Sequence, residues 1–167
     1  ETMTVINLTP GAHYYFAARV FDNAWYDVLS NTADSDVTYG GVYAPAGVTY
    51  EENDPIWEFN AAFPGWAIVT DATASGGQYR RINNAPEGSS ARFWFSGTRF
   101  RLYFQQGTGY GKLDVYVDGT KIGRIDQYYV GTRWWTALFS GLAPGNHVVE
   151  FRVVGGKASI DAIRPMP

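Results

Sequence analysis

The chain has 167 residues, of which 46% are hydrophobic, 17% aromatic and 17% charged, with 19 glycines and no cysteine. This composition excludes a disordered, coiled-coil or collagen-like chain, and the lack of cysteine excludes disulfides and thiolate metal sites. The formal net charge is −3, with neither a basic cluster typical of nucleic-acid binding nor an apolar stretch of the roughly 18 residues that a membrane span needs. We therefore expect one domain, or one domain plus a fragment, with a neutral partner.

The first 40 residues carry a strand-like pattern from the first position, so we expect the chain to be cut from a longer protein. Leu8 is followed by the turn signal Pro10-Gly11, and Tyr14 comes six residues after Leu8, at the start of an alternating strand. These residues resemble the second half of a fibronectin type III domain, in which Tyr14 matches the tyrosine corner. The resemblance implies about three strands in 1–40 whose apolar face needs a cover, from the second module or by self-association.

Glycine and proline cluster in 41–47, which predicts a linker, and residues 48–167 then alternate between apolar and polar positions. Asp118-Gly119 is the strongest hairpin signal, since both residues of such a turn need positive φ. Many short strands between glycine-rich turns predict an all-β fold, an antiparallel β-sandwich or jelly roll. The alternating runs are Phe93–Phe95, Phe100–Phe104, Leu113–Val117 and Val149–Val153, and turn signals stand at Ser96-Gly97, Pro144-Gly145 and Gly155-Gly156.

Three stretches follow one another in this part of the chain: Gly65-Trp66 with Ser75–Tyr79, Ala91–Thr98 followed by Gly111–Gly119, and Gly141–His147 leading to Ser159–Ile163. In this order they resemble the galactose-binding-like jelly rolls found as carbohydrate-binding modules and as modules of bacterial surface and secreted proteins. The resemblance implies a jelly roll over 48–167, an extracellular or cell-surface location and binding without catalysis.

The residues that catalysis would require are scarce. His13 and His147 are the only histidines, and each follows a Pro-Gly turn, where we expect a polar, half-exposed ring. The chain has no Gly-x-Ser-x-Gly elbow, no His-Glu-x-x-His motif and no phosphate-binding loop. We therefore predict no enzymatic activity and assign no catalytic residue.

The aromatic residues, with 6 tryptophans, 12 tyrosines and 10 phenylalanines, are too many for one core. Sugars expose apolar C–H faces that stack on flat rings, and their hydroxyls need neighbouring polar groups. Because adjacent strand residues point to opposite faces, we expect one ring of Trp134-Trp135 in the core and the other exposed. A third ring-rich segment, Trp57–Trp66, competes as a binding surface. The predicted ligand-binding residues are Gln105, Gln106, Tyr110, Tyr128, Tyr129, Arg133 and Trp135.

These rings predict a module that binds a neutral polysaccharide or glycan. The alternative is a structural subunit of a surface layer, fibre or appendage, because tyrosine, tryptophan and arginine are also enriched at contacts between proteins.

Related jelly-roll modules often hold a structural calcium ion between an early glutamate and a late aspartate. The resemblance therefore implies metal ligands at Glu51 and Asp161, with oxygen donors that suit calcium. The acidic run Glu51-Glu52-Asn53-Asp54 lacks the Glu-x-Glu spacing of those modules. We therefore favour a solvated acidic turn without a cofactor, with Asp161 bonded to backbone, and keep calcium as the alternative.

Overall fold

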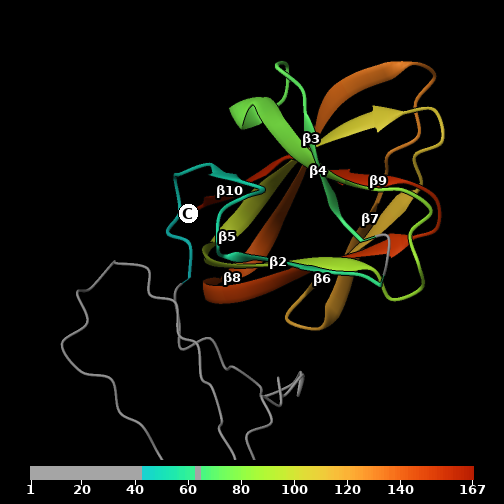
Figure 1. Ribbon diagram of the computed structural model, residues 1–167. Helices are drawn as coiled ribbons and strands as arrows, with labels where there is room; N and C mark the ends of the chain where they lie inside the picture. Colours follow the sequence, from blue (N-terminus) through green and yellow to red (C-terminus); the bar gives the residue numbers. More distant parts are fainter. Residues whose placement is uncertain (1–42, 63–64) are drawn as a thin grey trace, which may run out of the picture. The chain divides into compact units, whose positions relative to one another are not determined.

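The structure is a computed structural model that describes residues 43–62 and 65–167 (Figure 1). The predicted fibronectin-like segment 1–40, its self-association and His13 lie outside these residues. Ala44, within the predicted linker, is fully buried and forms a β-bridge with Phe95. This part of the linker segment therefore packs on the module.

The described residues fold into strands and one short 3-10 helix, and the predicted all-β class is confirmed. Within these ranges, no helix has the length and apolar character needed to cross a membrane. The elements are β1 (Tyr50–Glu51), β2 (Trp57–Asn60), β3 (Ala67–Thr70), η1 (Ser75–Gly77), β4 (Gln78–Ile82), β5 (Ser90–Gly107), β6 (Lys112–Val117), β7 (Thr120–Asp126), β8 (Thr132–Val154), β9 (Ala158–Ile160) and β10 (Ala162–Met166).

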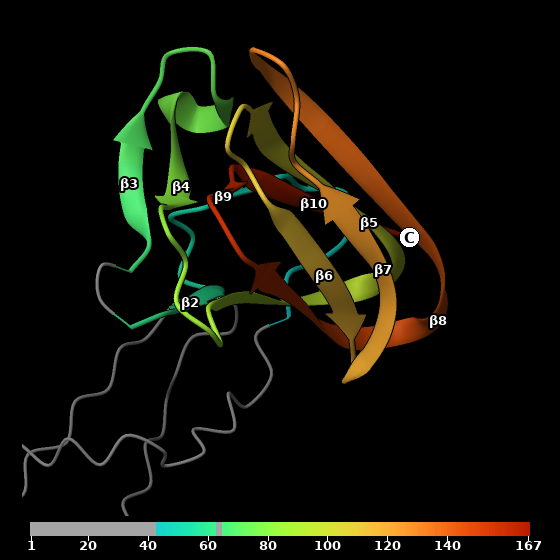
Figure 2. The ribbon, with the colours of Figure 1, turned by 90° about the vertical axis from the view of Figure 1, so that its right-hand side faces the viewer.

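The strands form two antiparallel sheets. The larger has the order β1-β10-β5-β8-β6-β7, with β2 also paired to β5, and the smaller has the order β3-β4-β9. Figure 2 shows β3 and β4 on one side of the module and the long strand β8 curving along the other. The chain therefore leaves the larger sheet after β2 and returns to it at β5, and β9 and β10 link the two sheets near the C-terminus.

The core lies on the inward side of β5 and includes residues of both sheets, with Ile82 and Ile160 from the smaller one. Phe93, Phe95, Phe100, Leu102 and Phe104 of this strand are at most 1% exposed, which confirms the predicted alternation. Each such side chain contributes on the order of 1.5–3 kcal/mol to folding by its removal from water. The same buried cluster includes, from β6 and β8, Leu113, Val115, Val117, Val149 and Phe151.

Two predicted turns, Ser96-Gly97 and Pro144-Gly145, are wrong. Gly97 pairs with Gly145 inside the β5–β8 ladder, and the register shifts between Gly97 and Arg99. An irregularity of this kind bends a strand pair without ending it, so glycine here marks a bend in two long strands.

The predicted hairpin at Asp118-Gly119 is confirmed, with φ values of 50° and 79° between β6 and β7. Its aspartate also binds β8: Oδ1 accepts a hydrogen bond from the Val148 N–H (2.9 Å) and Oδ2 lies 2.6 Å from Nδ1 of His147. The other ring nitrogen, Nε2, lies 2.8 Å from the Ala143 carbonyl oxygen. The prediction of a half-exposed His147 is therefore wrong: the ring is buried because it joins this hairpin to the bend of β8.

The two acceptors around His147 favour its protonated form. Burial alone would lower the pKa of the imidazole, but the hydrogen bonds to Asp118 and to the Ala143 carbonyl outweigh burial and raise it. A raised pKa in the folded state stabilises the protein below the pKa of the unfolded state, and the stabilisation is lost as pH rises through the folded pKa.

We expect the free energy of unfolding to fall through this group as pH rises above about 6.5, the ordinary pKa of histidine. Urea titrations of the wild type and of Asp118→Asn test this, because asparagine tolerates the positive φ but carries no charge. The variant should lose less stability over this range. An equal decline in both proteins would contradict the role of the pair.

Candidate functional site

The start of β8 places two tryptophans outside the core. Trp135 pairs with Phe104 and is 51% exposed, whereas Trp134 pairs with Gln105 and is partly exposed. The Trp134 ring meets the Tyr79 ring edge-on, at 5.2 Å between centroids and 85° between planes. The prediction that one of the two tryptophans belongs to the core is therefore wrong, and both rings are available near the surface.

A hollow of about 220 Å³ lies beside these rings. Tyr103 of β5 and Trp134, Trp135 and Thr136 of β8 line it, together with Asp161 between β9 and β10. Ligand sites of this kind combine apolar rings with a few converging polar groups, here a hydroxyl and a carboxylate. Of these lining residues, the sequence predicted only Trp135 as a ligand-binding residue. The structure adds Tyr103, Trp134 and Thr136.

Three predicted residues, Tyr129, Arg133 and Trp135, form a stack beside this hollow. The Arg133 guanidinium carbon lies 3.9 Å from the Tyr129 ring centroid and 4.3 Å from that of Trp135. Its Nε donates a hydrogen bond to Oε1 of Gln106 (2.8 Å), and Nε2 of Gln106 donates to the Asp126 carbonyl (2.8 Å). Cation–π contacts on two rings and a buried amide therefore fix the orientation of Trp135.

Gln105, Gln106 and Tyr110 do not form the exposed loop expected of them. Gln105 and Gln106 belong to β5, and all three residues are 5–6% exposed. Oε1 of Gln105 accepts hydrogen bonds from the hydroxyls of Tyr79 (3.1 Å) and Tyr110 (2.6 Å), and burial raises the pKa of Tyr110. The Gln105 and Tyr110 side chains bond to each other inside the module, because the register of β5 places the Gln105 side chain next to Tyr79 of β4.

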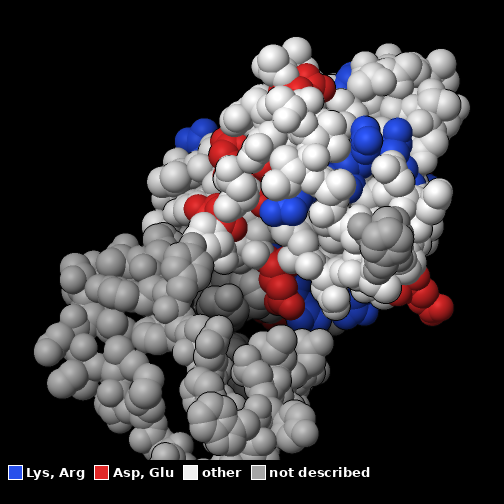
Figure 3. Space-filling view, in the orientation of Figure 1, with Lys and Arg blue, Asp and Glu red and all other residues white. Residues whose placement is uncertain are grey.

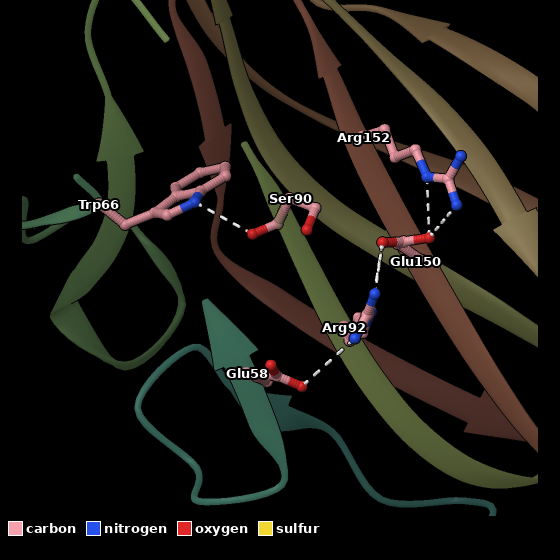
Figure 4. Close-up of polar contacts among 6 residues, drawn as sticks. All are labelled: Glu58, Trp66, Ser90, Arg92, Glu150 and Arg152. Carbon is pink, nitrogen blue, oxygen red and sulfur yellow. Dashed lines mark hydrogen bonds and ion pairs between the residues drawn. The ribbon is translucent and has the colours of Figure 1, made fainter. Parts of the chain in front are cut away.

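The remaining predicted rings fall outside the hollow. Tyr128 is 55% exposed, next to the stacked Tyr129. In the competing segment, Trp57 is buried against Phe93, at 4.8 Å between centroids, and Trp66 packs partly on the core. Nε1 of Trp66 donates to the Ser90 carbonyl at 3.2 Å (Figure 4). The described rings of this segment, Trp57, Phe59 and Trp66, therefore supply core packing, and Phe63 lies outside the described residues.

Three carboxylates meet next to the hollow, and this cluster contradicts the solvated acidic turn. Glu52 is 1% exposed and Asp161 3%, and one oxygen from each of Glu51, Glu52 and Asp161 lies within 4.8 Å of the others. Oε2 of Glu51, both carboxylate oxygens of Glu52 and Oδ1 of Asp161 are buried without a hydrogen-bond partner. Buried charge without a partner is strongly unfavourable, so this arrangement requires neutralisation.

Ser75, the first residue of η1, holds two of these carboxylates in place through its N–H and its hydroxyl. Oδ2 of Asp161 accepts a hydrogen bond from the Ser75 N–H (3.2 Å), and Oε1 of Glu51 accepts one from the Ser75 hydroxyl (2.8 Å). Gly76 has a φ of 64°, and a Cβ there would approach Oε2 of Glu51 to 3.1 Å. Glycine is therefore required where η1 passes the carboxylates.

The pKa values of two of these carboxyl groups, Asp161 and Glu52, are raised. Burial raises the pKa of Asp161 to about 7; the Ser75 N–H opposes the rise, and the charges of Glu51 and Glu52 add to it. Burial also raises the pKa of Glu52. Protons or a cation can neutralise such a group, and several converging carboxylate oxygens are the donor set of a hard divalent cation. The four oxygens without partners fit such an ion.

Charged side chains elsewhere are paired or dispersed. Figure 3 shows acidic and basic groups interspersed over one face of the described part. Across β2, β5 and β8, Arg92 pairs with Glu58 and Glu150, and Glu150 pairs with Arg152 (Figure 4). The four charged side chains form ion pairs with one another across neighbouring strands, so we assign them a structural role.

Solved structures with the same fold include carbohydrate-binding proteins. A family 35 carbohydrate-binding module from an environmental isolate matches with a TM-score of 0.58 and 20% identity, covering 71% of this chain and 91% of the module. A Paenibacillus xanthan lyase matches with a TM-score of 0.56 and 20% identity, and the match covers 76% of this chain but only 14% of the lyase. A family 36 carbohydrate-binding module, solved with calcium and xylotriose, matches with a TM-score of 0.51 and 11% identity. This match covers 71% of this chain and 98% of the module. No family model and no curated protein matches the sequence. These similarities confirm the predicted jelly-roll fold.

The raised pKa of Asp161 has a measurable consequence in the absence of a cation. The folded state holds a proton on this group up to about pH 7, whereas the unfolded chain releases it near pH 4. The free energy of unfolding in EDTA should therefore fall as pH rises from about 4 to about 7.

Denaturation of the wild type and of Asp161→Asn across this range measures the effect, with Glu87→Gln as the matched control at an exposed carboxylate. The decline should be smaller in Asp161→Asn and unchanged in the control. If Asp161→Asn declines as steeply as the wild type, Asp161 is not the titrating group.

Proposed function

We propose that residues 48–167 form a non-catalytic module that binds neutral carbohydrate on the exposed rings of β5 and β8. The observation that carries this proposal is the hollow lined by Tyr103, Trp134 and Trp135, with the Thr136 hydroxyl and Asp161 at its wall. The apolar face of a sugar ring can stack on a tryptophan while its hydroxyls bond to the partly exposed Thr136 hydroxyl.

The Arg133 stack supports this role because it prepares Trp135 before a ligand arrives. One face of the Trp135 ring is occupied by the guanidinium, which leaves the opposite face for a ligand. A side chain that is already ordered loses less conformational entropy on binding. Tyr129 and Arg133 thus contribute by holding the ring, and Tyr128 extends the exposed aromatic surface beside them.

The surrounding chemistry favours an uncharged ligand and no catalysis. The Arg133 guanidinium contacts two rings, so its charge is already stabilised, and the face of the described part in Figure 3 carries acidic and basic groups interspersed, which does not favour a polyion. The fold shared with family 35 and family 36 carbohydrate-binding modules supports the same reading. A glycan ligand also supports an extracellular or cell-surface location.

We also propose that Glu51, Glu52 and Asp161 hold a structural calcium ion. The support is the set of buried oxygens without partners, which a hard cation would satisfy. When bound, calcium would supply positive charge that keeps the three carboxylates ionised together.

Replacement of Trp135 by alanine tests the binding surface. Loss of the exposed ring should weaken binding to a retaining neutral polysaccharide at least about tenfold, which corresponds to about 1.4 kcal/mol. Affinity electrophoresis against a polysaccharide panel selects the ligand, and titration calorimetry measures the change.

Ile68→Ala, at an exposed apolar residue of β3 in the other sheet, is the matched control and should bind as the wild type does. If no polysaccharide retains the wild type, and light scattering shows concentration-dependent oligomers, the assembly role replaces this proposal.

Calcium should raise the thermal midpoint of unfolding at neutral pH. A ligand present at about 100 times its dissociation constant stabilises the folded state by about 2.7 kcal/mol, which corresponds to several degrees. Differential scanning calorimetry in calcium and in EDTA measures the shift for the wild type and for Glu52→Gln. The variant should lose most of the shift, and an unchanged midpoint in the wild type would contradict the calcium site.

A further inference from the structure

The loop between β3 and β4 lies between the carboxylate cluster and the ring-lined hollow. Its ends are joined by a hydrogen bond from the Asp71 N–H to the Gly77 carbonyl (3.0 Å), and the Ala74 N–H donates to the Asp71 carbonyl (2.9 Å). The segment is therefore a closed, internally bonded turn.

Ser75 fixes one side of this loop to the carboxylates. Its N–H and hydroxyl donate to Asp161 and Glu51, as described above, and each of these bonds is strongest when the acceptor is ionised. Ser75 thus links the loop to the carboxylate cluster through two hydrogen bonds.

Thr73 fixes the other side of the loop to the hollow. Oδ1 of Asp71 accepts hydrogen bonds from the Thr73 N–H (2.9 Å) and hydroxyl (2.6 Å), which sets the direction of the hydroxyl. The free lone pairs of this hydroxyl oxygen then accept a hydrogen bond from Nε1 of Trp134 (2.9 Å). Trp134 lines the hollow, so its indole is held by a residue of the loop.

We propose that Thr73 is a positioning residue that couples cation binding at Glu51, Glu52 and Asp161 to carbohydrate binding on Trp134. This inference rests on the proposed function. A cation keeps the carboxylates ionised and close together, so that Ser75, the loop and the Thr73 hydroxyl stay in place for the indole. Without the cation, repulsion among the carboxylates weakens the hold on Ser75, and Trp134 loses a fixed acceptor. The coupling is reciprocal, so bound carbohydrate also tightens cation binding.

The first experiment compares carbohydrate affinity in calcium and in EDTA for the wild type, Thr73→Val and Thr73→Ser. Valine keeps the shape of threonine without its hydroxyl, and serine keeps the hydroxyl without the methyl group. The wild type and Thr73→Ser should bind the retaining polysaccharide at least about fivefold more tightly with calcium. In Thr73→Val this ratio should fall toward one, while its calcium affinity stays near that of the wild type. Thr73→Ala serves as a second hydroxyl-free variant if Thr73→Val fails to fold.

The second experiment needs no carbohydrate. The ¹⁵N–¹H signal of the Trp134 indole, assigned from its absence in Trp134→Phe, is followed during a calcium titration. The signal should shift and exchange more slowly with solvent in the wild type and in Thr73→Ser, and should respond much less in Thr73→Val.

The outcomes separate this inference from the proposed function. Carbohydrate binding that is independent of calcium, or an equal calcium effect in Thr73→Val, would overturn the coupling and leave the binding function intact. If no carbohydrate binds, the proposed function fails, and the indole signal alone decides: an unchanged Trp134 signal in the wild type overturns the link.

Discussion

The burial of three carboxylates in one small space is the constraint on which the rest of the site depends. Glu51 ends the edge strand β1, Glu52 follows it, and Asp161 separates β9 from β10. Strand pairing between β1 and β10, with Glu51 opposite Ala162, forces these charges together. Their mutual repulsion opposes the same pairing unless protons or a cation neutralise them. The pairing of β1 with β10 at the acidic cluster therefore depends on the protons or cations that neutralise the three carboxylates.

The same cluster lies beside the surface that we assign to the ligand. Asp161 contributes to the hollow, and η1 connects the carboxylates to the loop that holds Trp134. On the other side, Arg133 holds Trp135 by a different means, through cation–π contacts and the amide of Gln106. The two adjacent tryptophans point to opposite faces of β8, and independent contacts order each of them.

The fold could be predicted from the sequence because its determinants are local. Alternation such as that of Phe100, Leu102 and Phe104 specifies which face of a strand is buried, and Asp118-Gly119 fits only a tight hairpin. The site could be predicted only in part, because it depends on the pairing of distant strands. The exposed stack of Tyr129, Arg133 and Trp135 follows from neighbouring positions in the chain. The burial of Gln105 depends on contacts with β4, and the burial of Asp161 beside Glu52 depends on long-range pairing that no local pattern encodes.

Anomalous X-ray diffraction from crystals grown with a lanthanide tests the central claim most directly, because such ions replace calcium among oxygen ligands. The account predicts one strong peak at about 2.3–2.6 Å from carboxylate oxygens of Glu51, Glu52 and Asp161. Electron density that shows these carboxylates in the same arrangement without a metal peak, bonded to one another through shared protons, would contradict it.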